Sequence, residues 1–256
     1  MDSILCSGKY HDVLALCGLG PRELGMQLSD PNLEPLELPS WVPDFRLNTQ
    51  HEPIGYADIA SWNTGGSNVG EVTISEDELR IQSYVIDRVS DIGPVIRSWN
   101  KDNVKEVLER AFKLSSTRTN PKQLTAGEVP SESTVRTIAR ALLLADGKHV
   151  GKKFSEKLRL RSDNRMMFGG ESGTIGLCKR MTEPVDVVCV FPGCRFPFTV
   201  RPQSDQGDFS HSLTVTPLRA QLVGWCYVDG MMNGEGLGDG TKTNFILAEV
   251  EDEFRV

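Results

Sequence analysis

The sequence lacks several features that would assign a function directly. Its 256 residues contain no apolar run long enough to cross a bilayer, and the N-terminus lacks the apolar stretch of a secretory signal. Acidic residues outnumber basic ones, and the formal net charge of −7 disfavours a protein that binds a nucleic-acid backbone. We therefore expect a cytoplasmic protein with no membrane span and no nucleic-acid partner.

Residues that carry catalysis or bind metals are also scarce. The chain has four histidines, no Gly-x-Ser-x-Gly motif and six cysteines that form no C-x-x-C pair. Several cysteines lie in apolar runs, where a cysteine usually behaves as a small buried hydrophobic residue. The sequence thus predicts reduced thiols, no metal and no cofactor.

A glycine-rich stretch at residues 234–240 is the one candidate for a phosphate-binding loop. A dinucleotide fingerprint places such glycines between a strand and a helix. Here the residues that follow have the pattern of a strand, so we expect a hairpin loop instead.

Short apolar runs punctuated by Gly, Pro, Asn and Asp fill the last third of the chain. These runs are rich in β-branched and aromatic residues, which is typical of strands in a sheet or small barrel. The predicted strands are residues 165–168, 174–178, 185–190, 196–201, 213–215, 220–228 and 244–250, with an earlier hairpin at 71–74 and 78–89.

Two stretches have the apolar period of an amphipathic helix, residues 103–114 and 132–145. Because neither helix can bury its apolar stripe alone, both should pack on the sheet. We predict an α+β fold with an antiparallel β-sheet or small β-barrel and two to four packed helices. The fold is a single domain, residues 1–256. Its parts are a wrapping N-terminal segment (1–70) anchored by Trp41, the hairpin and helices (71–164) and a β-rich core (165–251).

Aromatic and methionine side chains gather near the ends of the predicted strands. We expect a mostly apolar pocket there, covered by the loop 203–211 or by the turn that carries Trp62. The wall candidates are Trp62, Phe168, Trp225, Tyr227 and Met232. Core packing is the alternative for these side chains. Alternation along a strand places Trp225 and Tyr227 on one face, core or cavity, and Cys226 on the other.

Three polar residues are the candidates for catalytic groups, namely His211, Arg201 and Glu235. Each has a simpler alternative. A loop histidine such as His211 is often only exposed, and a carboxylate in a glycine-rich turn, such as Glu235, often caps backbone amides.

Several stretches resemble fungal heterokaryon-incompatibility (HET) proteins. They are residues 9–19, Leu38-Pro-Ser-Trp-Val-Pro-Asp44, 137–146, 173–177, 184–190 and 222–235, which reads Leu-Val-Gly-Trp-Cys-Tyr-Val-Asp-Gly-Met-Met-Asn-Gly-Glu. In that family the HET domain proper lies before these stretches. The resemblance therefore implies a stand-alone C-terminal module without the signalling roles of that domain.

Two functions follow from the resemblance. Small HET-like proteins resemble repurposed genes of fungal secondary metabolism, which implies a cofactor-independent cyclase of the Diels-Alderase or pericyclase type. Such an enzyme would hold a small apolar terpenoid or polyketide substrate in a shaped pocket and activate it by a hydrogen bond. The alternative is a non-enzymatic interaction or regulatory module. A deep closed pocket would favour the cyclase, and an exposed apolar patch without a cavity would favour the module.

Overall fold

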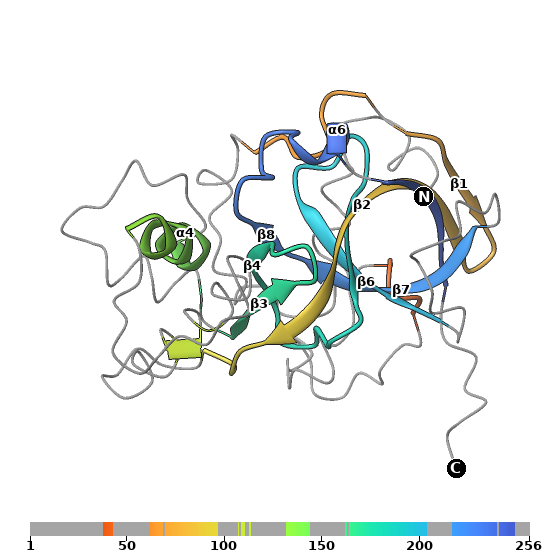
Figure 1. Ribbon diagram of the computed structural model, residues 1–256. Coiled ribbons are helices and arrows are strands. Elements are labelled where there is room, and N and C mark those ends of the chain that lie inside the picture. Colours follow the sequence, from red (N-terminus) through yellow and green to blue (C-terminus); the bar gives the residue numbers. More distant parts are fainter. Residues whose placement is uncertain are drawn as a thin grey trace, which may run out of the picture.

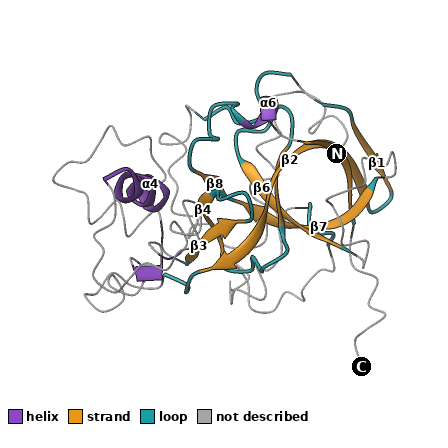
Figure 2. Ribbon diagram, in the orientation of Figure 1, coloured by secondary structure: helices purple, strands orange, loops and turns teal. Residues whose placement is uncertain are grey.

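The computed structural model describes residues 38–42, 62–68, 70–96, 107, 109–110, 113, 132–143, 162, 164–203, 217–239 and 241–248, and this part of the chain is mostly β. The named strands are β1 Val72–Ser75, β2 Glu78–Ile92, β3 Arg165–Gly170, β4 Ile175–Lys179, β5 Val187–Val190, β6 Pro197–Pro202, β7 Leu218–Trp225, β8 Tyr227–Val228 and β9 Thr241–Leu247. The named helices are α4 Glu132–Leu143 and α6 Gly236–Asp239 (Figure 2).

Five strands form a closed ring, visible at the right of Figure 1. Around it β2 pairs with β5, β5 with β6, β6 with β7, β7 with β9, and β9 again with β2. The prediction of an α+β fold with an antiparallel sheet or small β-barrel is therefore confirmed in part: the described residues are mostly β, with one large mixed sheet, a ring close to a barrel and two short named helices. The ring departs from a purely antiparallel sheet at one pair, since β7 and β9 run parallel.

The interior of the ring is filled by one alternating set of side chains. Successive strand residues point to opposite faces, so each strand sends every second residue inward. These residues are Leu79 and Ile81 from β2, Val187 and Cys189 from β5, Phe198 and Val200 from β6, Ala220 and Leu222 from β7, and Phe245 and Leu247 from β9. The ring is thus a packed core rather than an open channel.

The long strand β2 connects this ring to a smaller sheet. Its first half pairs with β9, its middle with β5 and its end with β3, with irregular register near Asp87 and near Asp91. Such irregularities bend a strand and let it change partners. Strands β3, β4 and β8 continue the sheet beyond β2. A second buried cluster joins them to β2 and β5, and it consists of Val89, Met166, Phe168, Cys178, Val188, Cys226 and Val228.

Two predicted elements differ in the structure. The strand expected at residues 220–228 is broken at Cys226, whose backbone N–H donates to the Pro197 carbonyl at 2.9 Å, so β7 belongs to the ring and β8 to the small sheet. The hairpin loop expected at 234–240 is wrong. That stretch contains α6, and the strands on either side of it pair with different partners. The strand predicted at 213–215 lies outside the described residues.

The two predicted long helices both contact the sheet. Helix α4 buries Ile138, Ala141 and Leu142 in the cluster that also contains Leu177 of β4, and Figure 1 shows it beside the small sheet. Of the helix predicted at 103–114, the described residues 107, 109, 110 and 113 are helical. Arg110 there forms an ion pair with Asp91 at the end of β2.

Trp41 is packed into the core, as the prediction of an anchor requires. Its indole is buried in the main core, and the indole N–H donates to the Asp77 carbonyl at 3.2 Å, in the turn between β1 and β2. The neighbouring Ser40 hydroxyl accepts a hydrogen bond from the Leu222 backbone N–H at 2.9 Å. Among the described residues, no helix has the length and apolar character required to cross a membrane.

Candidate functional site

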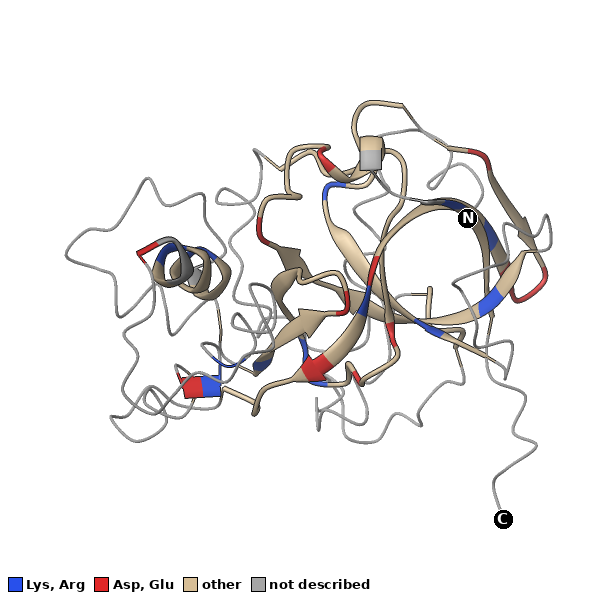
Figure 3. Ribbon diagram, in the orientation of Figure 1, with Lys and Arg blue, Asp and Glu red and all other residues tan. Residues whose placement is uncertain are grey.

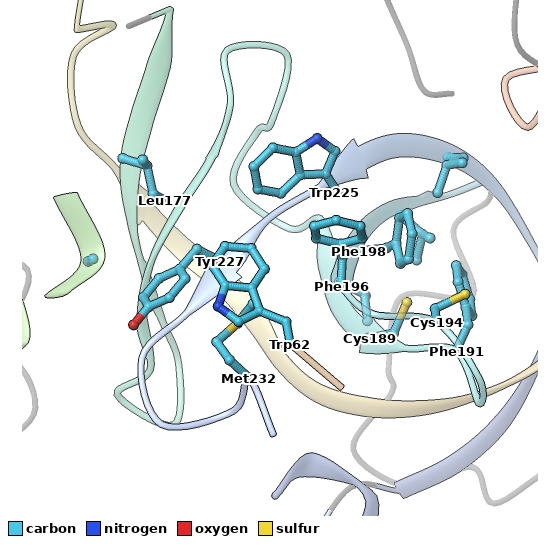
Figure 4. Close-up of a cluster of buried hydrophobic side chains, with 14 of the residues drawn as sticks. Trp62, Leu177, Cys189, Phe191, Cys194, Phe196, Phe198, Trp225, Tyr227 and Met232 are labelled. Atoms are coloured by element: carbon cyan, nitrogen blue, oxygen red, sulfur yellow. The ribbon is translucent and has the colours of Figure 1, made fainter. Parts of the chain in front are cut away.

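An aromatic cluster lies where β7 gives way to β8. Trp225 ends β7, Tyr227 begins β8, Phe196 precedes β6, and Trp62 comes from the segment before β1. The Trp62 ring centroid is 5.7 Å from that of Phe196 and 5.8 Å from that of Tyr227, and the centroids of Phe196 and Trp225 are 5.2 Å apart. Figure 4 shows Met232 beside Trp62 and Tyr227. The structure thus brings together four of the five predicted wall residues.

These side chains are packed against one another. Trp225 and Tyr227 are each 3% exposed and Trp62 is 8% exposed. The buried Arg165 guanidinium carbon lies 3.8 Å from the Trp225 ring centroid, which is the geometry of a cation–π interaction. Trp225 and Tyr227 share a cluster while Cys226 lies in the other, so the predicted alternation is confirmed.

Phe168 does not join this cluster. Its side chain is fully buried in the second core, against Gly176 of β4, where a Cβ atom would overlap the Phe168 ring. Every residue of β3 is buried. An apolar sequence pattern therefore could not show which of these residues faces the main core and which faces the second core.

Arg201 is engaged in an ion-pair network at the other end of its strand. Its Nε and Nη2 atoms bond the Asp186 carboxylate at 2.9 and 3.1 Å, Nη1 lies 3.1 Å from Glu183, and Nη2 also donates to the Met181 carbonyl. Burial raises the pKa of Asp186, and the hydrogen bonds from Arg201 oppose that rise. This network holds the turn before β5 against β6.

Glu235 caps a turn, which is the simpler of its two predicted roles. Its carboxylate accepts hydrogen bonds from the Asn233 backbone N–H at 2.6 Å and from the Asn233 side chain at 3.3 Å. The structure does not bring Glu235 and Arg201 into one network. The third candidate, His211, lies outside the described residues.

A polar group beside the aromatic cluster was not predicted. Arg140 of α4 makes a bidentate ion pair with Asp229, with N–O distances of 2.7 and 2.8 Å. The hydrogen bond to Asp229 raises the pKa of Arg140, and burial opposes that rise. The sequence signal was slight, because a salt bridge between residues 89 positions apart leaves no local pattern.

Sequence reasoning also missed how closely residues 62–66 dock. The sequence predicts only a turn there, which carries Trp62 over the expected pocket. In the structure their backbone bonds the turns 193–195 and 229–234, and the Thr64 hydroxyl donates to the Arg195 carbonyl at 2.8 Å.

The described thiols are unsuited to nucleophilic chemistry. Cys178, Cys189, Cys194 and Cys226 are buried and not joined in disulfides. Burial raises the pKa of Cys178 to about 12 and also raises the pKa values of Cys189 and Cys226, so these thiols stay protonated near neutral pH. Within the described ranges, no group of three or more His, Cys, Asp and Glu side chains is arranged to hold a metal ion.

Comparison with known proteins shows that part of the chain is similar to a known family. Residues 140–248 match the family model of the Het-6 beta-barrel domain. The chain is 30% identical over 104 residues to heterokaryon incompatibility protein 6, OR allele, of Neurospora crassa, and the aligned part is 40% of this chain and 14% of that protein. No solved structure matches the chain. The resemblance to fungal heterokaryon-incompatibility proteins is therefore confirmed over this part of the sequence.

Proposed function

Because residues 140–248 match the Het-6 barrel, we propose that this chain is a non-enzymatic interaction module of heterokaryon-incompatibility type, which acts by binding another protein. One observation carries the proposal. The side chains predicted to make a catalytic site, where described, are already engaged with one another or in structural networks.

The contacts of each candidate support this proposal. The Arg201 guanidinium contacts Asp186, Glu183 and a backbone carbonyl. Breaking its bidentate ion pair with the buried Asp186 carboxylate would cost stability. Glu235 is exposed, and its carboxylate accepts a hydrogen bond from the Asn233 backbone N–H in the same turn. A general acid or base needs a reacting group within hydrogen-bond reach and a second group beside it, and these two residues lie in separate networks.

The charges of the barrel favour a protein partner over a polyanion. Glu78 of β2 forms ion pairs with Arg80 on the same strand and with Arg219 on β7. Basic and acidic residues are interspersed along the described strands (Figure 3). A surface for a phosphate backbone concentrates charge of one sign.

The cofactor-independent cyclase of fungal secondary metabolism is the second candidate. One observation favours it, since Trp62, Trp225, Tyr227 and Met232 do meet in one cluster, with the Arg165 guanidinium against Trp225. An apolar terpenoid or polyketide intermediate would need Trp62 to leave that cluster before it had room to bind.

One experiment separates the two candidates. The tagged full chain is expressed in Neurospora crassa, purified under mild crosslinking, and any protein retained in near-equal amount is titrated against the purified chain. In parallel the purified chain is incubated with acyclic terpenoid and polyketide precursors. We expect a directly binding protein and no conversion. Conversion that falls at least tenfold in Trp225→Phe, without a bound protein, would overturn the proposal in favour of the cyclase.

A further inference from the structure

We propose that the turns 191–196 and 229–234 form a peptide-recognition groove, which the chain's own residues 62–66 occupy in cis. The groove fits a partner segment of the pattern aromatic-Xaa-Thr-Gly in the turn that residues 63–66 form, where the Gly66 N–H donates to the Asn63 carbonyl at 3.1 Å. This inference rests on the proposed interaction function and names the kind of partner for it.

Backbone hydrogen bonds hold the segment against both turns of the groove. The Asn63 N–H donates to the Met232 carbonyl at 3.0 Å, and the Gly65 N–H donates to the Cys194 carbonyl at 2.7 Å. In return the Gly193 N–H donates to the Gly65 carbonyl at 2.9 Å. Main-chain bonds of this kind give affinity without reading side chains.

The first position of the segment lies in an aromatic socket made by Phe196, Tyr227 and Met232. The Trp62 indole packs edge-on against Phe196 and at a tilt against Tyr227, with Met232 beside it (Figure 4). A buried aromatic side chain in a well-packed pocket is the usual energetic anchor of an interface. The groove therefore selects a large aromatic residue at this position.

At the third position of the segment the groove recognises a hydroxyl group. At the fourth position it leaves no room for a side chain. The Thr64 hydroxyl is fully buried and donates to the Arg195 carbonyl at 2.8 Å. A Cβ atom on Gly65 would overlap the Phe191 carbonyl oxygen and lie 2.7 Å from the backbone N and O of Cys194. Because these are backbone atoms with no side-chain freedom, the groove accepts only glycine there.

The guest and the groove belong to different parts of the chain. The groove residues Cys194, Arg195, Phe196, Tyr227 and Met232 all lie within the residues that match the barrel family, whereas residues 62–66 lie outside them. A tethered guest has a high effective concentration, so a partner segment must outcompete it. The cis segment thus keeps the groove closed until such a partner is present.

A labelled peptide with the sequence of residues 60–67 tests the proposal by fluorescence anisotropy. Trp62→Ala in the full chain empties the socket, and we expect this variant to bind the peptide at least tenfold more tightly than the unmodified chain. Gly65→Ala in the full chain should have the same effect by expelling the segment through a clash. Gly238→Ala is the matched control, because a Cβ atom there meets nothing within 4 Å, and it should bind like the unmodified chain.

Peptide variants test the pattern itself. Replacing the peptide's Trp or its first Gly by Ala should each weaken binding at least tenfold. If indole alone binds Trp62→Ala as tightly as the peptide does, the site is merely a cavity and the proposal fails. It fails as well if thermal unfolding shows that both chain variants are folded and neither binds more tightly.

The unmodified chain supplies a readout that depends on no variant. Millimolar peptide should displace the cis segment and speed amide hydrogen exchange at Asn63 and Gly65, and no change at saturating peptide would overturn the proposal. These outcomes are independent of the search for a natural partner. If a protein partner binds and the peptide does not, only the groove proposal is contradicted. If the peptide binds and no protein partner does, only the proposed function is contradicted.

Discussion

Val185 occupies a backbone conformation that its side chain disfavours. Its φ is 79°, it follows Pro184, and the Asp186 N–H donates to the Glu183 carbonyl at 3.2 Å. Proline followed by a positive φ is the pattern of a type II turn, which normally has glycine at the position of Val185. Val185 is also 54% exposed, so it gains little from burial in return.

Val185→Gly should therefore stabilise the chain. A β-branched residue in the left-handed region costs about 1–2 kcal/mol, and the extra flexibility of glycine in the unfolded state offsets about half of that. We expect the free energy of unfolding to rise by roughly 0.5–1 kcal/mol in urea denaturation. Val185→Ala keeps the positive φ and should change little. A clear loss of stability in Val185→Gly would show that the turn is not strained.

Trp225 should behave as a core residue. It is 3% exposed and is held between Phe196 and the Arg165 guanidinium. Trp225→Ala should lower the free energy of unfolding by about 3–5 kcal/mol, which denaturant titration measures. Trp225→Phe retains an aromatic ring and should lose less. An unchanged stability for Trp225→Ala would instead place this side chain in a cavity wall.

The alternation of side chains along a strand predicted which residues lie together at Trp225 and Tyr227, but not at Phe168. It placed Trp225 and Tyr227 together, and the two side chains do share one cluster although β7 ends at Trp225 and β8 begins at Tyr227. It did not separate Phe168 from them, since every residue of β3 is buried and the two cores cannot be told apart along one strand. The roles of Arg201 and Glu235 depend on partners that only the fold brings near.

At the scale of elements, one buried carboxylate ties β5 to β6. Asp186 precedes β5, is fully buried, and receives two hydrogen bonds from Arg201 of β6 and one from the Glu183 N–H. Burial raises its pKa above the unfolded value. The folded state therefore binds this proton more tightly than the unfolded state does.

This shift predicts the sign of a pH dependence. The contribution of Asp186 to stability should be fullest below its unfolded pKa of about 3.9 and be lost as the pH rises through its folded pKa. Asp186→Asn removes this titration. The stability of the unmodified chain minus that of Asp186→Asn should fall as the pH rises from 4, as urea denaturation at each pH would show. Glu183→Gln keeps Asp186 and should keep the sign of the slope, because burial is the largest cause of the shift. A difference that grows with pH would mean that Arg201 outweighs burial.

Strand positions were predictable from the sequence because each strand carries its own apolar pattern. The hairpin of β1 and β2 and the strands β3 to β6 lie within a few residues of their predicted ranges. The break at Cys226 was not predictable. Residues 222–228 form one apolar run without a polar break. Only the different partners of β7 and β8, which are β6 and β4, divide it.

At the scale of the whole molecule, the barrel depends on a strand outside the matched family domain. Strand β2 closes the ring between β5 and β9, yet residues 140–248 do not include it. The same strand continues into the small sheet through β3. Strand β2 and the stretch from β7 to β8 both pass from the ring to the small sheet. The ring and the small sheet are therefore joined by continuous backbone as well as by side-chain contacts.

The shared strands lead us to predict that the described layers unfold as one unit, consistent with a single domain. The buried thiols report on this directly, since Cys178 and Cys226 lie in the second core and Cys189 and Cys194 in the first. A protected thiol reacts only when its surroundings open, so its labelling rate gives the free energy of that opening.

Alkylation in increasing urea, resolved by mass spectrometry for each cysteine, should give all four thiols the same opening free energy, equal to that of global unfolding. Full denaturation without reductant should release six reactive thiols, including Cys6 and Cys17. Val89→Ala serves as a probe of the second core, and in a cooperative molecule it should lower the protection of all four thiols equally. If instead Cys178 and Cys226 lose protection while Cys189 and Cys194 keep it, the small sheet opens by itself. The closed ring would then be the only cooperative unit among the described strands.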